Sequence, residues 1–231
     1  MSLVGRSKLL KDLVSGISTL ENILLRLKVI FSDLQDEKLM EWLDGEIRGY
    51  TVKELPHYRI LRGQPMGTYI VNQSGQYKNA PVPLKLVLPE EMVNDLCIVN
   101  VTDGLIAIEN ILKSENRENY AKTVPTELCH SISRPEFQIL GMHIKIASNQ
   151  LDGIISNTKL KLTEIIMMLE KSFENIDELD ISSQIEEQPK TAQSVIYNIQ
   201  SIVFGDTTEI DIGDKNKIKE SSIGKFLRRE K

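Results

Sequence analysis

The sequence has few of the residues that build metal sites and disulfide frameworks, with two cysteines and three histidines among 231 residues. Cys97 and Cys129 lie far apart in the sequence and can form at most one bridge, so a reducing compartment is the simplest interpretation. His57, His130 and His143 show no helical pairing and no neighbouring metal-site motif. We therefore expect no metal ion and no catalytic histidine or cysteine.

Long apolar runs are also missing. No window approaches the roughly 18 to 20 apolar residues that a membrane span requires. The first segment, residues 1–16, interleaves charged and apolar residues and has no apolar stretch of the kind found in a secretory signal. We expect a cytoplasmic protein with no membrane contact.

An excess of positive charge is absent too, because the formal net charge is -5 and the isoelectric point is near 5.4. Such a chain is not attracted as a whole to phosphate backbones, and residues 1–190 hold no obvious basic patch. The sequence also has no glycine-rich phosphate loop, no G-x-S-x-G motif and no dinucleotide-binding fingerprint. Nucleic acid is therefore not expected as a partner, and no cofactor is expected.

What is present at the beginning of the chain is helical periodicity. Apolar residues recur every three or four positions from Leu20 to Leu34, which predicts an amphipathic helix. A shorter helix precedes it and ends near Gly16, and a third runs from Asp36 to Arg48. Short joints between the three favour a small helical bundle.

From Leu55 the period changes to that of strands. Tyr58–Arg62 and Thr68–Val71 are short and separated by glycine and proline, which predicts a strand, a turn and a strand. Residues 73–80 are predicted as a loop, and a strand is expected through Leu86 and Leu88.

The rest of the domain is predicted to be mixed. Helices are expected after Pro89, over 105–112 and around Leu128, while 137–146 alternates as a strand does, with a helix as the alternative. A long helix over 149–173 is expected to close the core. The fold class is therefore α+β, with an N-terminal helical bundle packed with a small β-sheet in one domain spanning 1–173.

Beyond that domain the composition shifts. Residues 174–192 are rich in acids and read as a linker. Two eight-residue units, 203–210 and 211–218, share a Gly-Asp pair and a final isoleucine, and 195–202 fits a degenerate third unit. This period predicts a β-rich tail over 193–231, built either as solenoid-like rungs or as a simple hairpin.

Too few rungs are present to bury a core, so the tail is expected to stack on another copy, a partner or its own domain. A homo-oligomer is the expected outcome, and removal of residues 191–231 is expected to lower the mass measured by light scattering. The residues expected to carry this assembly are Ile202, Phe204, Ile210, Ile212 and Ile218.

One polar cluster is a candidate ligand site. Tyr58, Arg59 and Arg62 follow a helix that carries Glu41 and Glu46. Arginines beside an acidic helix either clamp a phosphate or carboxylate, because a guanidinium fork matches those anions, or pair with the acids and fix the helix against the sheet. No residue of this cluster is assigned a catalytic role.

Several stretches together resemble the AbiTii domain of bacteria, over roughly residues 5 to 173. The segments that carry the resemblance occur in the family's order. They are Glu41-Trp42-Leu43, Glu46-Ile47, Gly49-Tyr50, Leu55-Pro56-His57-Tyr58-Arg59, Arg62-Gly63, Pro81-Val82-Pro83-Leu84, Leu88-Pro89-Glu90, Leu151-Asp152-Gly153-Ile154 and Leu169-Glu170. At the beginning of the last helix the family tends to carry an arginine, where this sequence has Asn157 and Thr158.

The resemblance implies a role in bacterial defence, an abortive-infection response to phage, and implies no particular reaction. Two classes of function follow. In the first, the protein is a non-catalytic interaction or sensor module that self-assembles and has a possible protein partner in a defence system. In the second, it is a toxin-like enzyme such as a nuclease, with its site near Glu41–Arg62. The enzyme hypothesis requires those acids and arginines to converge, unpaired, in a concave pocket.

Overall fold

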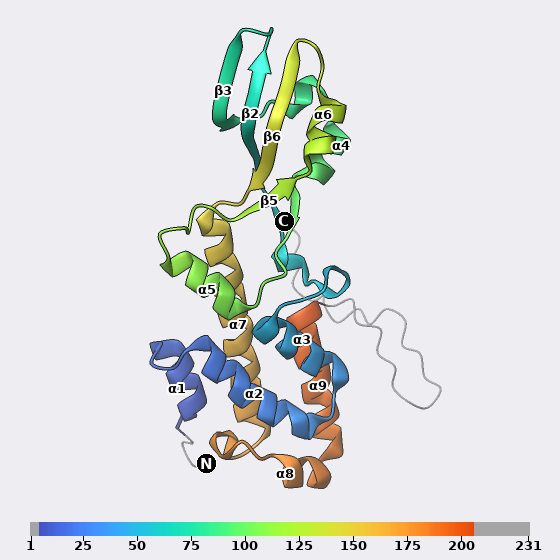
Figure 1. Cartoon of the computed structure of the whole chain (residues 1–231). Coiled ribbons are helices and arrows are strands. Elements are labelled where there is room, and N and C mark those ends of the chain that lie inside the picture. The colour runs from blue at the N-terminus through green and yellow to red at the C-terminus, as the bar shows by residue number, and fades with distance from the viewer. Residues whose placement is uncertain (1–4, 206–231) are drawn as a thin grey trace, which may run out of the picture.

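The first three helices form where the apolar spacing predicts them, in a computed structural model that describes residues 5–205 (Figure 1). They are α1 (Lys8–Ser15), α2 (Leu20–Leu34) and α3 (Glu37–Arg48). Ser7, Thr19 and Asp36 stand before them, and each side chain accepts a hydrogen bond from the backbone N–H three residues later. These caps satisfy N–H groups that have no partner inside the helix.

The strands form two antiparallel sheets. A two-stranded sheet pairs β1 (Ile60–Arg62) with β4 (Ile98–Asn100). A four-stranded sheet has the order β3-β2-β6-β5, built from β2 (Gln64–Val71), β3 (Gly75–Pro81), β5 (Ala121–Val124) and β6 (Phe137–Lys145). Asn72 and Gln73 both have positive φ in the turn that joins β2 to β3, as the tightest hairpin turns require.

The strands predicted at 58–62 and 68–71 form as β1 and within β2. The turn predicted between them is wrong, because residues 64–67 belong to β2 and the two segments pair with other strands. Leu61 lies opposite Val99, whereas Tyr69 lies opposite Tyr77 on one side and Ile139 on the other. Residues 57–59 form a short 3-10 helix, η2 (His57–Arg59), before the strand begins. Which strands pair depends on contacts between segments far apart in the sequence, and local strand propensity does not predict those contacts.

Two further local predictions are wrong. Residues 75–81, expected within a loop, form the edge strand β3, and the expected strand through Leu86 and Leu88 is the 3-10 helix η3 (Leu84–Leu86). Strand β5 was not predicted, because only its last residue, Val124, is buried and its pattern resembles a loop.

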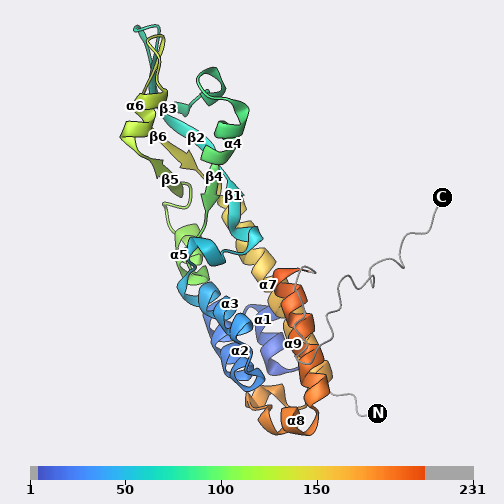
Figure 2. The ribbon, with the colours of Figure 1, turned by 90° about the vertical axis from the view of Figure 1, so that its right-hand side faces the viewer.

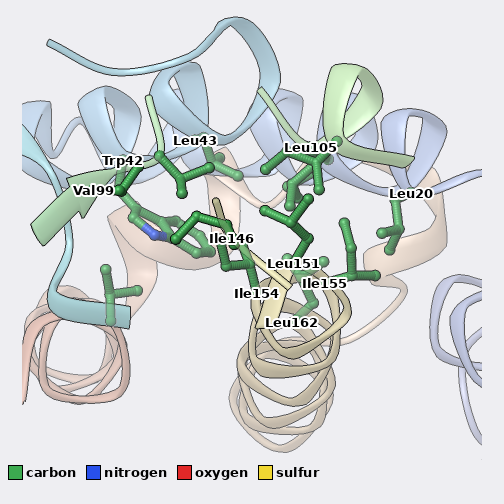
Figure 3. Packing of buried hydrophobic residues seen from close by; sticks show 14 of the residues in the cluster. Leu20, Trp42, Leu43, Val99, Leu105, Ile146, Leu151, Ile154, Ile155 and Leu162 are labelled. Carbon is green, nitrogen blue, oxygen red and sulfur yellow. The ribbon is translucent and has the colours of Figure 1, made fainter. Parts of the chain in front are cut away.

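The remaining helices of the predicted domain lie where the sequence places them. They are α4 (Glu90–Leu96), α5 (Leu105–Lys113), α6 (Thr126–Ile132) and α7 (Ser148–Ser172). Figure 3 shows Leu151, Ile154, Ile155 and Leu162 of α7 turned toward Leu43 and Leu105. The α+β class and the long closing helix are therefore confirmed.

Residues 174–204 are folded, in contrast to the predicted acidic linker and β-rich tail. They form η4 (Ile176–Glu178), α8 (Ser182–Glu187) and α9 (Pro189–Phe204). The segment 195–202, expected as a β unit, lies inside α9, where Val195, Ile199 and Val203 are buried in the same core as α7. The repeat units at 206–218 lie outside the described residues.

Two hydrogen-bonded carboxylates, of Asp177 and Asp33, hold this segment to the N-terminal helices. Asp177 accepts hydrogen bonds from the backbone N–H groups of Lys8 (2.8 Å) and Leu9 (3.0 Å), at the first turn of α1. Asp33 of α2 accepts one from the N–H of Ile181 (2.9 Å), whose side chain is buried. A carboxylate at a helix N-terminus meets free donors and the positive end of the helix dipole, which explains why this acidic stretch docks.

The molecule is elongated, with the helices gathered at one end and the four-stranded sheet at the other (Figures 1 and 2). Helices α1, α2, α3, α8 and α9 surround the lower part of α7, while α4 and α6 lie beside the sheet. Among residues 5–205, no helix combines the length and apolar content that crossing a bilayer requires.

Docking of α9 predicts a clear contrast between its two faces. Ile199 is fully buried, so Ile199→Ala is expected to lower the free energy of unfolding by about 2–5 kcal/mol, because it removes buried methyl groups and leaves a cavity. Ser194 is exposed on the same helix, so Ser194→Ala is the matched control and is expected to be nearly neutral. Urea denaturation of both variants measures this, and equal stabilities would show that α9 does not belong to the folded unit.

Candidate functional site

The predicted polar cluster centres on an ion pair in the interior of the molecule. The guanidinium of Arg59 meets the carboxylate of Glu46 in a fork, with Nη2 2.7 Å from Oε2 and Nε 3.2 Å from Oε1. Both side chains are 0% exposed. Two planar groups matched in this way form the strongest geometry for an arginine–carboxylate pair.

Two tyrosines complete the shell of the carboxylate. The hydroxyls of Tyr50 and Tyr58 lie 2.7 Å and 2.6 Å from Glu46 Oε1, and Trp42 Nε1 donates to the hydroxyl of Tyr58 at 3.0 Å. The Arg59 guanidinium also lies over the ring of Tyr50, 4.9 Å from its centre. We call Glu46, Arg59, Tyr50, Tyr58 and Thr158 the buried polar centre.

The other donors of the centre are satisfied as well. Thr158 on α7 lies 3.3 Å from Glu46 Oε2, and Arg59 Nη1 donates to the carbonyls of Asp103 (2.6 Å) and Val101 (3.3 Å). Within residues 5–205, every buried side-chain nitrogen and oxygen has a hydrogen-bond partner. The centre therefore joins α3, η2, the segment between β4 and α5, and α7.

The end of α3 is shaped to admit Tyr50. A Cβ at Gly45 would lie 2.1 Å from the Tyr50 ring, so the ring occupies the space of a missing side chain. Gly49 has φ +103°, which turns the chain sharply, and a Cβ there would lie 2.6 Å from the carbonyl oxygen of Thr102. The Tyr50 N–H donates to the same carbonyl at 2.8 Å. Only glycines at both positions let the ring fold back over the helix.

Burial and charge fix the protonation states in the centre. Burial raises the pKa of Tyr50 and of Tyr58, and the negative charge of Glu46 raises both further. For Arg59, burial acts to lower the pKa, but the charge and hydrogen bond of Glu46 together with the two phenols outweigh it, and the pKa is raised. Both phenols remain donors and the guanidinium remains charged at neutral pH. None of these three groups is poised for general acid–base catalysis there.

Two of the predicted site residues do not join this cluster. Glu41 is exposed on α3, and Arg62 is exposed at the end of β1, where it donates to Asn94 on α4. The structure therefore brings together Glu46, Tyr58 and Arg59 and leaves Glu41 and Arg62 apart. Of the predicted assembly residues, Ile202 is half-buried and Phe204 is 39% exposed at the end of α9, while Ile210, Ile212 and Ile218 lie outside the described residues.

Sequence reasoning missed the polar roles of Trp42, Tyr50 and Thr158. Nothing local in the sequence indicates that Trp42 donates to the Tyr58 hydroxyl or that the Tyr50 hydroxyl meets Glu46. Thr158 is one of the two residues, with Asn157, at the place where the AbiTii family tends to carry an arginine. A basic group, Lys161, lies one turn further along α7, with its amine 5.5 Å from the centre of the Tyr58 ring. Burial lowers the pKa of Lys161.

Among residues 5–205, the cysteines and histidines do not form a cluster of the kind that binds metal ions. Cys97 and Cys129 are buried free thiols whose pKa is raised by burial. In the part of the chain that the structure describes, no three residues among histidine, cysteine, aspartate and glutamate are grouped so that they could hold a metal ion.

Comparison with known proteins gives one family. The family model that matches is AbiTii, over residues 6–195, which covers all elements from α1 to the first turns of α9. No curated protein and no solved structure matches the chain.

The buried pair predicts a large loss of stability when its charge balance is broken. Glu46→Gln leaves the guanidinium of Arg59 without a counter-charge in the core, and we expect the free energy of unfolding to fall by about 3–5 kcal/mol. Glu41→Gln removes an acid from the exposed face of the same helix and is expected to leave stability nearly unchanged. Thermal and urea unfolding measure both, and a Glu46→Gln protein as stable as the Glu41→Gln protein would refute this account of the centre.

Proposed function

The chain belongs to the AbiTii family, which suggests a role in abortive infection, a defence against phage, and we propose that it acts there as a non-catalytic binding module that self-assembles. The family membership supplies the biological setting. The molecular activity is our proposal, argued from the chemistry of the candidate site and of the surface.

The observation that carries the proposal is the closure of the buried polar centre. A catalytic carboxylate or arginine has to reach its substrate, yet the side chains of Glu46 and Arg59 have no exposed surface and bind each other. The convergent, unpaired cluster that the enzyme reading requires is therefore absent from the region between Glu41 and Arg62. The centre is best explained as the element that fixes α3 and α7 to the chain entering β1.

The exposed surface supports binding. At the sheet end, Tyr77, Leu86 and Leu140 are 50%, 65% and 44% exposed, on a part of the molecule that projects away from the helices (Figure 1). In the helical part, Phe204 is 39% exposed at the end of α9. Exposed apolar side chains at the end of a projecting element are suited to contacts with other molecules.

Enzymatic turnover is the direct test of the non-catalytic proposal. Purified full-length protein is expected to leave single-stranded RNA, double-stranded DNA and ATP intact. In cells, Glu41→Gln and Arg62→Ala are expected to preserve phage resistance, measured as plating efficiency, because both residues are exposed and outside the buried polar centre. The proposal would be overturned, in favour of the nuclease hypothesis, if the protein turned over one of these substrates and either substitution abolished that turnover without changing the melting temperature.

The assembly test has to keep α9 intact. Because α9 ends at Phe204 and its buried face belongs to the core, removal should begin at residue 206 and not at 191. The chain ending at Gly205 is expected to keep the melting temperature of the full chain and to show a lower mass by light scattering. Equal masses for the two chains would contradict self-assembly through residues 206–231.

A further inference from the structure

The four-stranded sheet carries a pocket that the buried polar centre does not involve. It has a volume of about 450 Å³ and is lined by Val71 and Asn72 at the end of β2 and by Glu136 and Phe137 at the beginning of β6. Its walls come from β2, β3, β6, η3 and the segment before β6. The residues that matter for its chemistry are Tyr69, Tyr77, Phe137, Leu86, Arg134 and Glu136. Pockets of about 300–1,000 Å³ are the usual size for small ligands.

One wall of the pocket is a row of aromatic rings across three neighbouring strands. Tyr69 stacks on Tyr77 with the ring centres 5.0 Å apart and an angle of 12° between the planes, and Phe137 lies 5.1 Å from Tyr69 on the other side. Phe137 and Tyr69 are buried, whereas Tyr77, at the end of the row on the edge strand, is 50% exposed. The row therefore ends in a ring that another flat aromatic group can extend.

The polar side of the pocket holds one cation and one carboxylate. The backbone of Arg134 is fixed by two hydrogen bonds with Phe137, of 2.8 Å and 3.0 Å, and its guanidinium donates to the carbonyl of Val87 at 3.3 Å. Among the described residues, Arg134 has no acidic partner and the side chain of Glu136 has no hydrogen bond. The guanidinium is thus available for an anion and the carboxylate for an N–H donor.

We infer that this pocket binds a nucleoside monophosphate, whose base extends the row of rings at Tyr77, whose phosphate meets Arg134 and whose exocyclic amino group meets Glu136. A polynucleotide fits less well, because Arg134 is the one cation that residues 5–205 contribute to the lining of this pocket and the chain has a net charge of -5.

The inference rests on the proposed function in one respect, because it gives the binding module its ligand. The two can fail separately. Binding is measured on purified full-length protein without phage, whereas the proposed function is judged by turnover and plating efficiency.

The experiment is calorimetric titration of the full-length protein with AMP, adenosine and ribose 5-phosphate. AMP is expected to bind at least about tenfold more tightly than either fragment, because only AMP reaches both the aromatic row and Arg134. Tyr77→Ala is expected to weaken AMP binding by about tenfold or more through lost stacking, while Tyr77→Phe keeps the affinity. Arg134→Gln is expected to weaken AMP binding by a similar factor and to leave adenosine binding unchanged.

The matched control is Arg48→Gln, which removes the same charge from the exposed end of α3, outside the lining of the pocket. It is expected to bind AMP as the unaltered protein does. Because Arg134 and Tyr77 are exposed, both variants should fold, and circular dichroism confirms this before titration. Absence of AMP binding, or equal affinity in Arg134→Gln and Arg48→Gln, would overturn the inference and leave the binding-module proposal to its own tests.

Discussion

The ion pair of Glu46 and Arg59 is the constraint on which the rest of the structure depends. Each charge taken out of water costs several kcal/mol, so the pair is stable only when every remaining donor and acceptor is also satisfied. The partners come from α3, η2, the segment after β4, and α7, and all must be in place together. Because Ile60 begins β1 directly after Arg59, the same pair fixes where the sheet region begins.

This requirement explains the sequence around the pair better than apolar packing alone does. Near the end of helix α3 lie Gly45, Gly49 and Tyr50. The two glycines do not stabilise the helix, because glycine has a low helix propensity. They are needed because the Tyr50 ring lies over Gly45 and its hydroxyl meets Glu46. The AbiTii-like stretch from Trp42 to Arg59 is thus, in physical terms, the shell of one buried carboxylate.

Apolar periodicity in the sequence predicted those helices and strands that form from a single segment. Helices α1, α2, α3 and α7 follow from apolar spacing, and strand β6 from alternation, because those periods are properties of single segments. Three features depend on residues far away in the chain: the pairing of β1, the edge strand β3 and the docking of 174–204. Asp177, for example, accepts hydrogen bonds from the backbone N–H groups of Lys8 and Leu9. For the site, charge and proximity along the chain placed Glu46, Tyr58 and Arg59 in one cluster. Charge and proximity could not show that Glu41 and Arg62 lie outside the cluster. They also could not show that Thr158, 112 residues from Glu46, belongs to it.

Helix α7 has a mechanical consequence. It is 25 residues long, about 37 Å at 1.5 Å per residue, and only Ile146 and Ala147 separate it from β6. Ile146 is fully buried, so a bend at this joint would disturb the packed core. We therefore expect the strand and the helix to move together. A displacement of the sheet would then reach the helical part of the molecule through α7.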